Sequence, residues 1–527
     1  MADFDDYFAF YEKGAYREAY AILRNIMKHE SRWSKVGDMY LRCADLELLI
    51  NDDLNRARQF LNKALKLGCS DMSFYYNTLG YVLWRVGERD RGKQYLEKSI
   101  ELEPSISNLK TLGRILSHEE DKDAIKIWHR ILEKEPNHCL AYVYLGIEAV
   151  KSGDRAKAFD MAKRAESLSP TIRNFYDIGR LYYDLEQYQN ALDMFLKADR
   201  GHYEPKGSLY SDIAACYCSL GDNDTAIGYA SRAIDLNFDD DYAKSILLQC
   251  MEKEETCNIL NSFVQAHNDT CLVAILHAQE ATREKKFSEA QTLLSKAKQL
   301  GPSSLEMYYI GRQYHFMQCF DKALDVYLGA KKMGYDKGGR LFTDIAGCYS
   351  NIQETHEAIQ YACKAIDLDV DDEYAKDILL SITEEKGTCE ILDSFLEEHH
   401  NTCLVVMLLA QGAAKEKNVS EVKVLLSEAE QLEPSPVEKY YIGRLYDLLE
   451  CKEKALDRYL EAEKLGYASE SLLYSSIAWC YFSLDDYDAS IQYALKALVV
   501  DPDDEYAKDV LFTSRKEAWG SDFGDNY

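Results

Sequence analysis

Apolar residues recur along most of this chain at intervals of three and four, and polar breaks interrupt them at regular distances. In the segment YNTLGYVLWRVGERDRGKQYLEKSIELEP, residues 76–104, a break near Gly87 separates two such stretches, and Pro104 ends the second. The spacing is typical of one face of an α-helix, and Gly and Pro mark helix ends. The segment therefore predicts a helical hairpin, and residues 142–170 repeat the arrangement.

A longer repeat, with a constant step of 132 in the numbering, runs above the hairpins. YDIGRLYYDL at 176–185 returns as YYIGRQYHFM at 308–317 and as YYIGRLYDLL at 440–449. DDDYAKSILL at 239–248 returns as DDEYAKDILL at 371–380, after the same step. We expect diverged N-terminal repeats at 1–137, modules at 138–269, 270–401 and 402–519, the last with a terminal helix, and a disordered tail at 520–527.

Within a module the hairpins recur at a spacing of roughly 34 residues, with small and aromatic residues at fixed places. Residues 174–200 supply Ile178, Gly179, Tyr182, Ala191, Phe195 and Ala198. This pattern resembles the tetratricopeptide repeat, over nearly the whole chain. The resemblance implies an all-α fold: a right-handed α-solenoid of about fifteen helical hairpins, with a concave groove, a convex surface and a final helix near 503–519.

One hairpin in each module departs from this pattern. Four standard repeats, each of roughly 34 residues, would be slightly longer than one module. The deficit falls in the segment at 239–269, which lacks the Leu-Gly signature. We therefore expect shorter helices there and a local change in the superhelical step.

The charge of the chain narrows the classes of partner. Acidic residues outnumber basic ones by 90 to 62, and the net charge is −28. Nucleic acids and anionic membranes are bound by clustered Lys and Arg, so this charge disfavours both. The N-terminal MADFDDYFAF does not resemble a secretory signal, and apolar runs such as 403–410 are too short for a membrane span. We interpret the fifteen cysteines as mainly buried thiols of a reducing compartment, and expect a cytoplasmic location.

Motifs for chemistry are not found in the sequence. It contains no glycine-lysine phosphate loop, and the CYC segment at 216–218 places its two thiols on different faces of a helix. We therefore expect no catalytic residues, no metal and no cofactor. The family's carboxylate clamp, which grips the C-terminal tails of heat-shock chaperones, is not matched either. Asn77 and Tyr81 stand where its first Lys and Asn would be, and Thr111 lies in the following helix.

A stripe of side chains is the strongest candidate for binding. Arg173, Tyr176, Arg180 and Tyr183 share one face of the helix at 173–184. By resemblance that face lines the concave groove, and Arg114 occupies the same place in an earlier hairpin. Small polar residues, Ser211, Thr343 and Ser475, are expected beside the stripe in the adjacent hairpins. The candidate partner-binding residues are Tyr176, Arg180, Tyr308, Arg312, Tyr440, Arg444 and Trp479.

Two interpretations of the repeated arginines remain open. They could bind a partner, or they could form local ion pairs, because Asp177 and Asp184 lie within one turn of Arg180 and Asp447 within one turn of Arg444. Arg312 has no acidic residue at that spacing.

The expected function is a non-catalytic scaffold or adaptor whose groove binds a protein or an extended peptide with carboxylates or phosphates. A ligand- or peptide-sensing regulator and a non-catalytic subunit of an enzyme complex are the alternatives, and self-association stays open.

Overall fold

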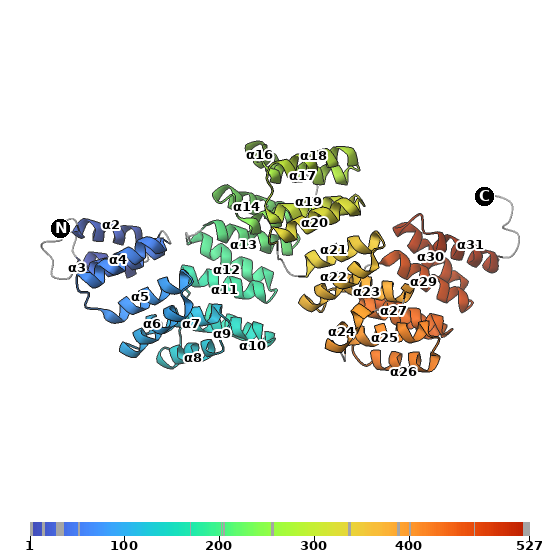
Figure 1. The fold of residues 1–527 in the computed structure, drawn as a ribbon, viewed down its shortest axis with the longest axis horizontal. Coiled ribbons are helices and arrows are strands. Elements are labelled where there is room, and N and C mark those ends of the chain that lie inside the picture. Colours follow the sequence, from blue (N-terminus) through green and yellow to red (C-terminus); the bar gives the residue numbers. More distant parts are fainter. Residues whose placement is uncertain are drawn as a thin grey trace. The chain divides into compact units, whose positions relative to one another are not determined.

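The protein is all-α. The computed structural model describes residues 4–12, 16–27, 36–50, 53–168, 170–201, 203, 206–253, 258–335, 339–386, 390–399, 402–467 and 469–519. Within these ranges it has 31 α-helices and no β-strand (Figure 1). The helices form fifteen successive pairs followed by α31 (Glu505–Trp519), so the predicted number of hairpins and the terminal helix are confirmed. The predicted tail at 520–527 lies outside the described residues.

Two compact units make up the chain, Met1–Cys250 and Met251–Tyr527. The boundary between them falls inside α15, whereas the sequence modules are defined by the long repeat alone and stay a prediction. The first unit contains α1 (Phe4–Glu12), α2 (Tyr16–Met27), α3 (Val36–Ile50), α4 (Leu54–Lys66), α5 (Met72–Arg85), α6 (Arg89–Leu102), α7 (Ile106–His118), α8 (Asp123–Lys134), α9 (Cys139–Lys151), α10 (Arg155–Glu166), α11 (Ile172–Asp184), α12 (Tyr188–Arg200), α13 (Lys206–Ser219), α14 (Asn223–Leu236) and most of α15 (Asp241–Lys253).

The second unit continues the same alternation of first and second helices. It contains α16 (Asn258–Ala266), α17 (Cys271–Arg283), α18 (Phe287–Gln299), α19 (Ser304–Phe316), α20 (Phe320–Lys332), α21 (Arg340–Asn351), α22 (Thr355–Leu368), α23 (Glu373–Lys386), α24 (Glu390–Glu398), α25 (Cys403–Lys415), α26 (Val419–Ala429), α27 (Pro436–Leu448), α28 (Lys452–Lys464), α29 (Glu470–Ser483), α30 (Tyr487–Val500) and α31.

Helices pack in two ways within each unit. The two helices of a hairpin pack against each other, and the first helix of a hairpin also contacts the first helix of the next. In the first unit this second contact runs from α3 through α5, α7 and α9 to α11 (Figure 1). The five first helices therefore form one continuous wall, on which side chains from distant parts of the sequence meet.

The repeated Ile-Gly pairs are part of the core of their hairpins. Ile178, Ile310 and Ile442 are fully buried. Gly311 on α19 faces the ring of Tyr327 on α20, and a Cβ atom at this glycine would lie only 2.6 Å from that ring. Gly179 meets Phe195, and Gly443 meets Tyr459, in the same way. The glycine recurs because a methyl group would separate the two helices of the hairpin.

Every hairpin turn that the structure describes in full has a residue in the left-handed conformation. In α11–α12 this residue is Glu186, with φ of 60°. Its amide donates to the Tyr183 carbonyl and the next amide, of Gln187, to the Tyr182 carbonyl, both at 2.9 Å. These bonds are a Schellman motif, which satisfies the last carbonyls of the helix. The same position holds Gly87, Gly153 and Gly221 in other hairpins, but Gln318 and Glu450 in α19–α20 and α27–α28.

The divergent hairpin is shorter in its second helix only. The expectation that both helices are short is wrong, because α15 and α23 have 13 and 14 residues, whereas α16 and α24 have nine each. In the second unit α23 contacts not only α25 but also α27. The Val437 amide donates to Glu373 Oε2 at 3.1 Å, and the Tyr441 hydroxyl donates to Asp377 Oδ1 at 3.1 Å. The short α24 thus accompanies a direct contact between helices that are far apart in the sequence.

The repeated DDDYAK segment connects the first helices of two neighbouring hairpins through hydrogen bonds. Asp240 caps α15 by accepting the Ala243 amide at 3.0 Å, and its other oxygen accepts the Ser211 hydroxyl of α13 at 2.8 Å. Asp372 and Asp504 make the same pair of bonds, with Thr343 and Ser475 as the hydroxyl donors. Ser211, Thr343 and Ser475 are buried. The prediction that these three form polar patches in the groove is therefore wrong, because their hydroxyls are committed to the next helix cap.

Candidate functional site

The three candidate tyrosines lie beneath the surface that the arginines reach. Tyr176, Tyr308 and Tyr440 are 8%, 3% and 2% exposed. Each ring stacks on a second tyrosine from the loop after its hairpin, Tyr203, Tyr335 or Tyr467, with centroids 4.5, 4.6 and 4.7 Å apart. The tyrosines thus form the floor under the arginines, and their rings are covered on one face.

Arg180 on α11 is exposed, and its guanidinium group interacts with Asp212 and Tyr176. Burial acts to lower its pKa, but Asp212 of α13 and a hydrogen bond with Tyr176 raise it above its ordinary value. Asp177, one of the two predicted local partners, instead has Arg173 Nε at 3.6 Å. Arg180 therefore has a carboxylate partner from the next hairpin in addition to the acids of its own helix.

In the second unit Arg444 has a carboxylate partner outside its own helix. Arg444 Nη2 lies 3.1 Å from Glu384 Oε1 on α23, and its Nη1 donates to Tyr440 Oη at 3.4 Å. The predicted local partner, Asp447, pairs with Lys452 instead. The Arg312 guanidinium lies 5.4 Å from the Phe316 ring centroid.

Trp479 on α29 is half-buried among aromatic and basic side chains. Its ring stacks on Phe482, with centroids 5.6 Å apart, and Lys452 Nζ lies 5.5 Å from its centroid. The candidates of the second unit thus lie on several helices, and their partner-binding role stays a prediction.

A groove of about 760 Å³ lies in the first unit, along the wall made by α3, α5, α7, α9 and α11. Among the predicted candidates it includes Tyr176 and Arg180, together with Arg114. The lining residues are Asp45, Leu48, Leu49, Asn77, Thr78, Tyr81, Trp84, Arg85, Ser107, Lys110, Thr111, Arg114, Ile115, Ser117, His118, Val143, Tyr144, Ile147, Arg173, Tyr176, Asp177, Arg180 and Asp184.

The charge of this groove is opposite to that of the chain. Its lining has five basic side chains, Arg85, Lys110, Arg114, Arg173 and Arg180. It has three carboxylates, Asp45, Asp177 and Asp184. In the whole chain basic residues number 62 against 90 acidic ones. Since a recess with low-dielectric walls focuses the field of its charges, the groove attracts anions to an otherwise acidic protein.

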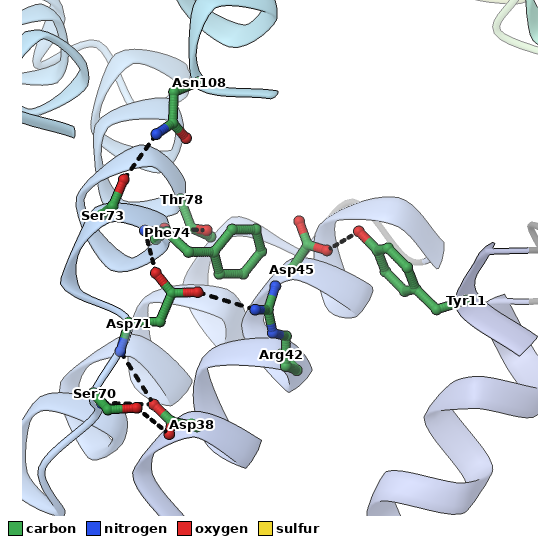
Figure 2. Close-up of polar contacts among 10 residues, drawn as sticks. All are labelled: Tyr11, Asp38, Arg42, Asp45, Ser70, Asp71, Ser73, Phe74, Thr78 and Asn108. Atoms are coloured by element: carbon green, nitrogen blue, oxygen red, sulfur yellow. Dashed lines mark hydrogen bonds and ion pairs between the residues drawn. The ribbon is translucent and has the colours of Figure 1, made fainter. Parts of the chain in front are cut away.

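Asp45 marks the end of the groove that lies nearest the N-terminal hairpins. It accepts a hydrogen bond of 2.6 Å from the Tyr11 hydroxyl, as Figure 2 shows. Burial raises the pKa of Asp45, while this bond and the nearby Arg42 act to lower it. Arg42 itself pairs with Asp71 at 3.0 Å and lies 3.9 Å from the Phe74 ring centroid (Figure 2). Asp45 is thus held by the first hairpin, whose described residues do not line the groove.

The opposite end of the groove is basic. Tyr16 on α2 interacts electrostatically with residues of both ends. Burial and the Asp45 carboxylate raise the pKa of Tyr16 on α2, while Arg173 on α11 acts in the other direction. Tyr16 therefore lies within electrostatic reach of both ends. A ligand in the groove would be surrounded by side chains from the second hairpin to the sixth.

Comparison with known families identifies the repeat. The family model of the tetratricopeptide repeat matches residues 75–106, 172–200 and 472–504, which correspond to α5–α6, α11–α12 and α29–α30. The chain contains tetratricopeptide repeats. Two of the three matched repeats supply groove residues, Tyr81 and Trp84 in one, Arg180 in the other.

Curated proteins similar to this chain share parts of it only. A protein described as the CTR9 homolog of Arabidopsis thaliana is 29% identical over 133 residues, 24% of this chain and 12% of its own length. The tetratricopeptide repeat-containing protein trd-1 of Caenorhabditis elegans is 22% identical over 152 residues, 27% of this chain and 20% of its own length. The chain therefore matches a small part of each of these two relatives.

Among solved structures, similarity extends along most of the chain. The Cut9-Hcn1 hetero-tetramer of the APC/C has a TM-score of 0.37 and 13% identity, over 90% of this chain and 96% of that one. Yeast Tom70 has a TM-score of 0.35 and 14% identity, over 85% of this chain and 95% of that one.

The residues at the positions of the chaperone-tail clamp are engaged in hydrogen bonds within the groove. The Thr111 hydroxyl donates to Asn77 Oδ1 at 3.1 Å, linking α7 to α5. The Tyr81 hydroxyl accepts a bond of 2.9 Å from Arg85. Asn77, Tyr81 and Thr111 all line the groove, but the lysine that a chaperone-tail clamp requires at residue 77 is replaced by the asparagine.

Three groove residues that the sequence reasoning missed are Lys110, Trp84 and Asp45. Lys110 stands four residues before Arg114, so both side chains project from one face of α7. That spacing was a signal in the sequence. Asp45 gave no such signal, because its segment matches the repeat pattern weakly and only the curvature of the unit brings it to the groove.

The thiols that recur in the modules are protonated at neutral pH. Cys216, Cys348 and Cys480 are buried, and burial with a nearby carboxylate raises the pKa of each to about 12. His315 Nδ1 lies 3.6 Å from Cys348 Sγ, but burial lowers the pKa of this imidazole too. A neutral thiol beside a neutral imidazole is not an activated nucleophile.

Metal sites and membrane spans are both absent from the ranges that the structure describes. No group of three or more His, Cys, Asp and Glu side chains in those ranges is arranged to hold a metal ion. None of the helices described there has both the length and the apolar character that a membrane crossing requires.

Proposed function

We propose that this protein is a non-catalytic scaffold or adaptor, and that the groove of its first unit binds an extended peptide segment of a protein partner. The observation that carries the proposal is the groove itself. It is a recess of about 760 Å³ with a basic lining on a protein of net charge −28. Tetratricopeptide repeats and their concave wall support a protein-interaction role.

The lining suits a peptide better than a compact molecule. Ligand pockets for small molecules enclose about 300–1,000 Å³ and are mainly apolar with few polar groups. The volume of this groove falls in that range, but eight of its lining side chains are charged, and they lie on four of its five helices, α3, α5, α7 and α11. Trp84 and Tyr81 offer aromatic surface between the acidic and the basic ends, and aromatic and Arg side chains are the usual anchors of a protein interface.

We propose a cytoplasmic location and no enzymatic activity. Protonated, buried thiols such as Cys348 support a reducing compartment and speak against a cysteine nucleophile. The charge of the whole chain speaks against nucleic acid as the partner, because phosphate neutralisation requires an extended basic surface. In the second unit, Arg312, Arg444 and Trp479 are candidates for a further contact, with a partner or with a second copy of the chain.

The test is capture of partners from a native lysate with the wild-type protein and two variants. Thr111→Trp places a large ring in the groove, at a half-buried position of α7. Ile125→Trp is the matched control, at a position of α8 that is 40% exposed and outside the groove. Both should keep the wild-type circular dichroism. We expect partners held by the wild type and by Ile125→Trp to be lost with Thr111→Trp. Equal capture by all three would place binding elsewhere.

A further inference from the structure

Arg114 and Arg173 lie beside one carboxylate of the groove, Asp177, and Lys110 lies beside Arg114. Lys110 and Arg114 come from α7, and Arg173 comes from α11. Arg173 Nε lies 3.6 Å from Asp177 Oδ1, and Arg114 is close enough to lower the pKa of the same carboxyl group. We call Lys110, Arg114, Arg173 and Asp177 the basic cluster.

The donors of this cluster are largely unused. Arg114 makes one hydrogen bond in the described residues, from Nε to the Tyr144 hydroxyl at 3.2 Å, and no ion pair there. Lys110 makes neither a hydrogen bond nor an ion pair with any described residue. Burial and the neighbouring Arg114 lower its pKa, against a weaker effect of Glu135. The cost of holding these charges together falls when an anion binds between them.

The charge of the cluster sets the class of anion. Three cations with one carboxylate leave two positive charges. Burial also raises the Asp177 pKa, which favours the neutral form of this carboxyl group. Arg180 also acts to lower the Asp177 pKa, but its own charge is offset by Asp212 and Asp184, so it is left out of this sum. A phosphate monoester carries a charge of about −1.5 to −2 at pH 7, whereas a carboxylate carries −1. Guanidinium groups also grip phosphate oxygens in a bidentate way.

We propose that the basic cluster binds a phosphorylated side chain of the partner peptide, a phosphoserine or phosphothreonine. The proposal rests on the proposed function, because it assigns the anion that the peptide presents in the same groove. Phosphorylation of the partner would then switch binding on, since the unmodified hydroxyl leaves the two positive charges uncompensated.

A peptide is the source of phosphate that the surroundings favour. The basic residues lie inside a recess, together with the carboxylates Asp45 and Asp184. A nucleic acid would bring its other phosphates against the acidic surface of a protein of net charge −28. A flat membrane cannot enter a recess walled by five helices. A peptide with one phosphate brings no further phosphates to the acidic surface, and a flexible chain can enter the recess.

The experiment uses four pools of fluorescent nine-residue peptides, degenerate except for a central phosphoserine, phosphothreonine, Glu or Ser. Binding to the full chain is followed by fluorescence anisotropy. We expect the phosphorylated pools to bind roughly tenfold more tightly than the Ser pool, with the Glu pool in between. Binding should weaken as salt rises, and phenyl phosphate should compete.

The variant is Lys110→Gln with Arg114→Gln. Its matched control is Lys126→Gln with Arg130→Gln, which removes the same two residue types at the same spacing from α8, outside the groove. We expect the first double variant to lose the preference for phosphorylated pools, roughly tenfold in affinity, and the control to keep it. If the first variant loses helicity, Arg173→Gln provides the second test of the same preference.

Several results would overturn the proposal. If the four pools bind alike and Thr111→Trp abolishes them all, the groove binds peptides without reading phosphate, and only the inference fails. If no pool binds, or if Thr111→Trp leaves binding intact, the proposed function fails with it. Preferential binding of single-stranded RNA or of phosphoinositide vesicles through Lys110 and Arg114 would replace the peptide by another partner.

Discussion

Two buried tyrosine hydroxyls give the sharpest test of how these hairpins are packed. Tyr327 and Tyr459 are 0% and 1% exposed, and their rings lie against Gly311 and Gly443. Neither hydroxyl has a hydrogen-bond partner among the described residues. The equivalent residue of the preceding module is Phe195, so the same site is occupied with and without the oxygen. Changing Tyr327 or Tyr459 to Phe should therefore stabilise its hairpin.

The magnitude follows from desolvation. Burying a hydroxyl without a partner costs about 1–3 kcal/mol in protein variants. Removing the oxygen also removes a few van der Waals contacts, each worth about 0.1–0.2 kcal/mol. We expect a net gain of about 1 kcal/mol for Tyr327→Phe and for Tyr459→Phe. The reverse change, Phe195→Tyr, should lower the stability of its hairpin by about 1–2 kcal/mol.

Local hydrogen exchange is the appropriate assay, because a chain of stacked repeats does not unfold in a single two-state step. The free energy of opening would be read from peptides of α19–α20 and α27–α28. Tyr446→Phe is the control, since its hydroxyl donates to Glu430 Oε1 at 3.0 Å, and it should lose about 1 kcal/mol. If Tyr327→Phe and Tyr459→Phe destabilise as the control does, their hydroxyls have partners and the reasoning is refuted.

Three further predictions use the same assay. Gly311→Ala should destabilise its hairpin by about 2–3 kcal/mol, because the new methyl group would lie 2.6 Å from the Tyr327 ring; an unchanged opening energy would mean that the ring can move away. Asp504→Ala should loosen α31 by about 1–2 kcal/mol. Burial raises the Asp504 pKa, but bonds from Ser475 and backbone amides outweigh it and hold the pKa below its usual value. The stability that the Asp504 carboxylate gives to α31 should therefore be fully present above pH ~4, the pKa of Asp in the unfolded chain, and should be lost as the pH falls through the lower pKa of the folded state. An opening energy that does not change with pH would contradict this. Glu450→Gly should stabilise its hairpin by about 0.5–1 kcal/mol, because residue 450 has φ of 60° and only glycine adopts it without strain; a loss of stability would show that the Glu450 side chain contributes more than the strain costs.

The order and the approximate ends of the helices follow from the amino-acid sequence alone. The apolar spacing of three and four, with its polar breaks, predicted fifteen hairpins and a last helix, and the structure has α1 to α31. This succeeds because the periodicity of a helix and the residues that end it are local properties. The role of the Ile-Gly pairs could also be predicted from the sequence, since the family pattern placed Ile178 and Gly179 towards the neighbouring helices.

Which side chains meet depends on tertiary packing. The sequence offered Asp447 as a possible local partner of Arg444, but the contact between α23 and α27 brings Glu384 to that arginine instead. It placed Tyr176 in the groove, which the structure's lining includes, but did not show that Tyr203 stacks on its ring. These pairings depend on the curvature that accumulates over several hairpins, which no local pattern encodes.

The groove shows the same difference between what the sequence determines and what tertiary packing decides. Its basic cluster unites Lys110 and Arg114 with Arg173, which lies two hairpins further along the chain. Each side chain could be placed on a helix face from the sequence, because the face follows from a step of roughly 100° per residue. Whether the faces of α7 and α11 point at one another depends on how each first helix packs against the next, and packing is a property of the folded stack.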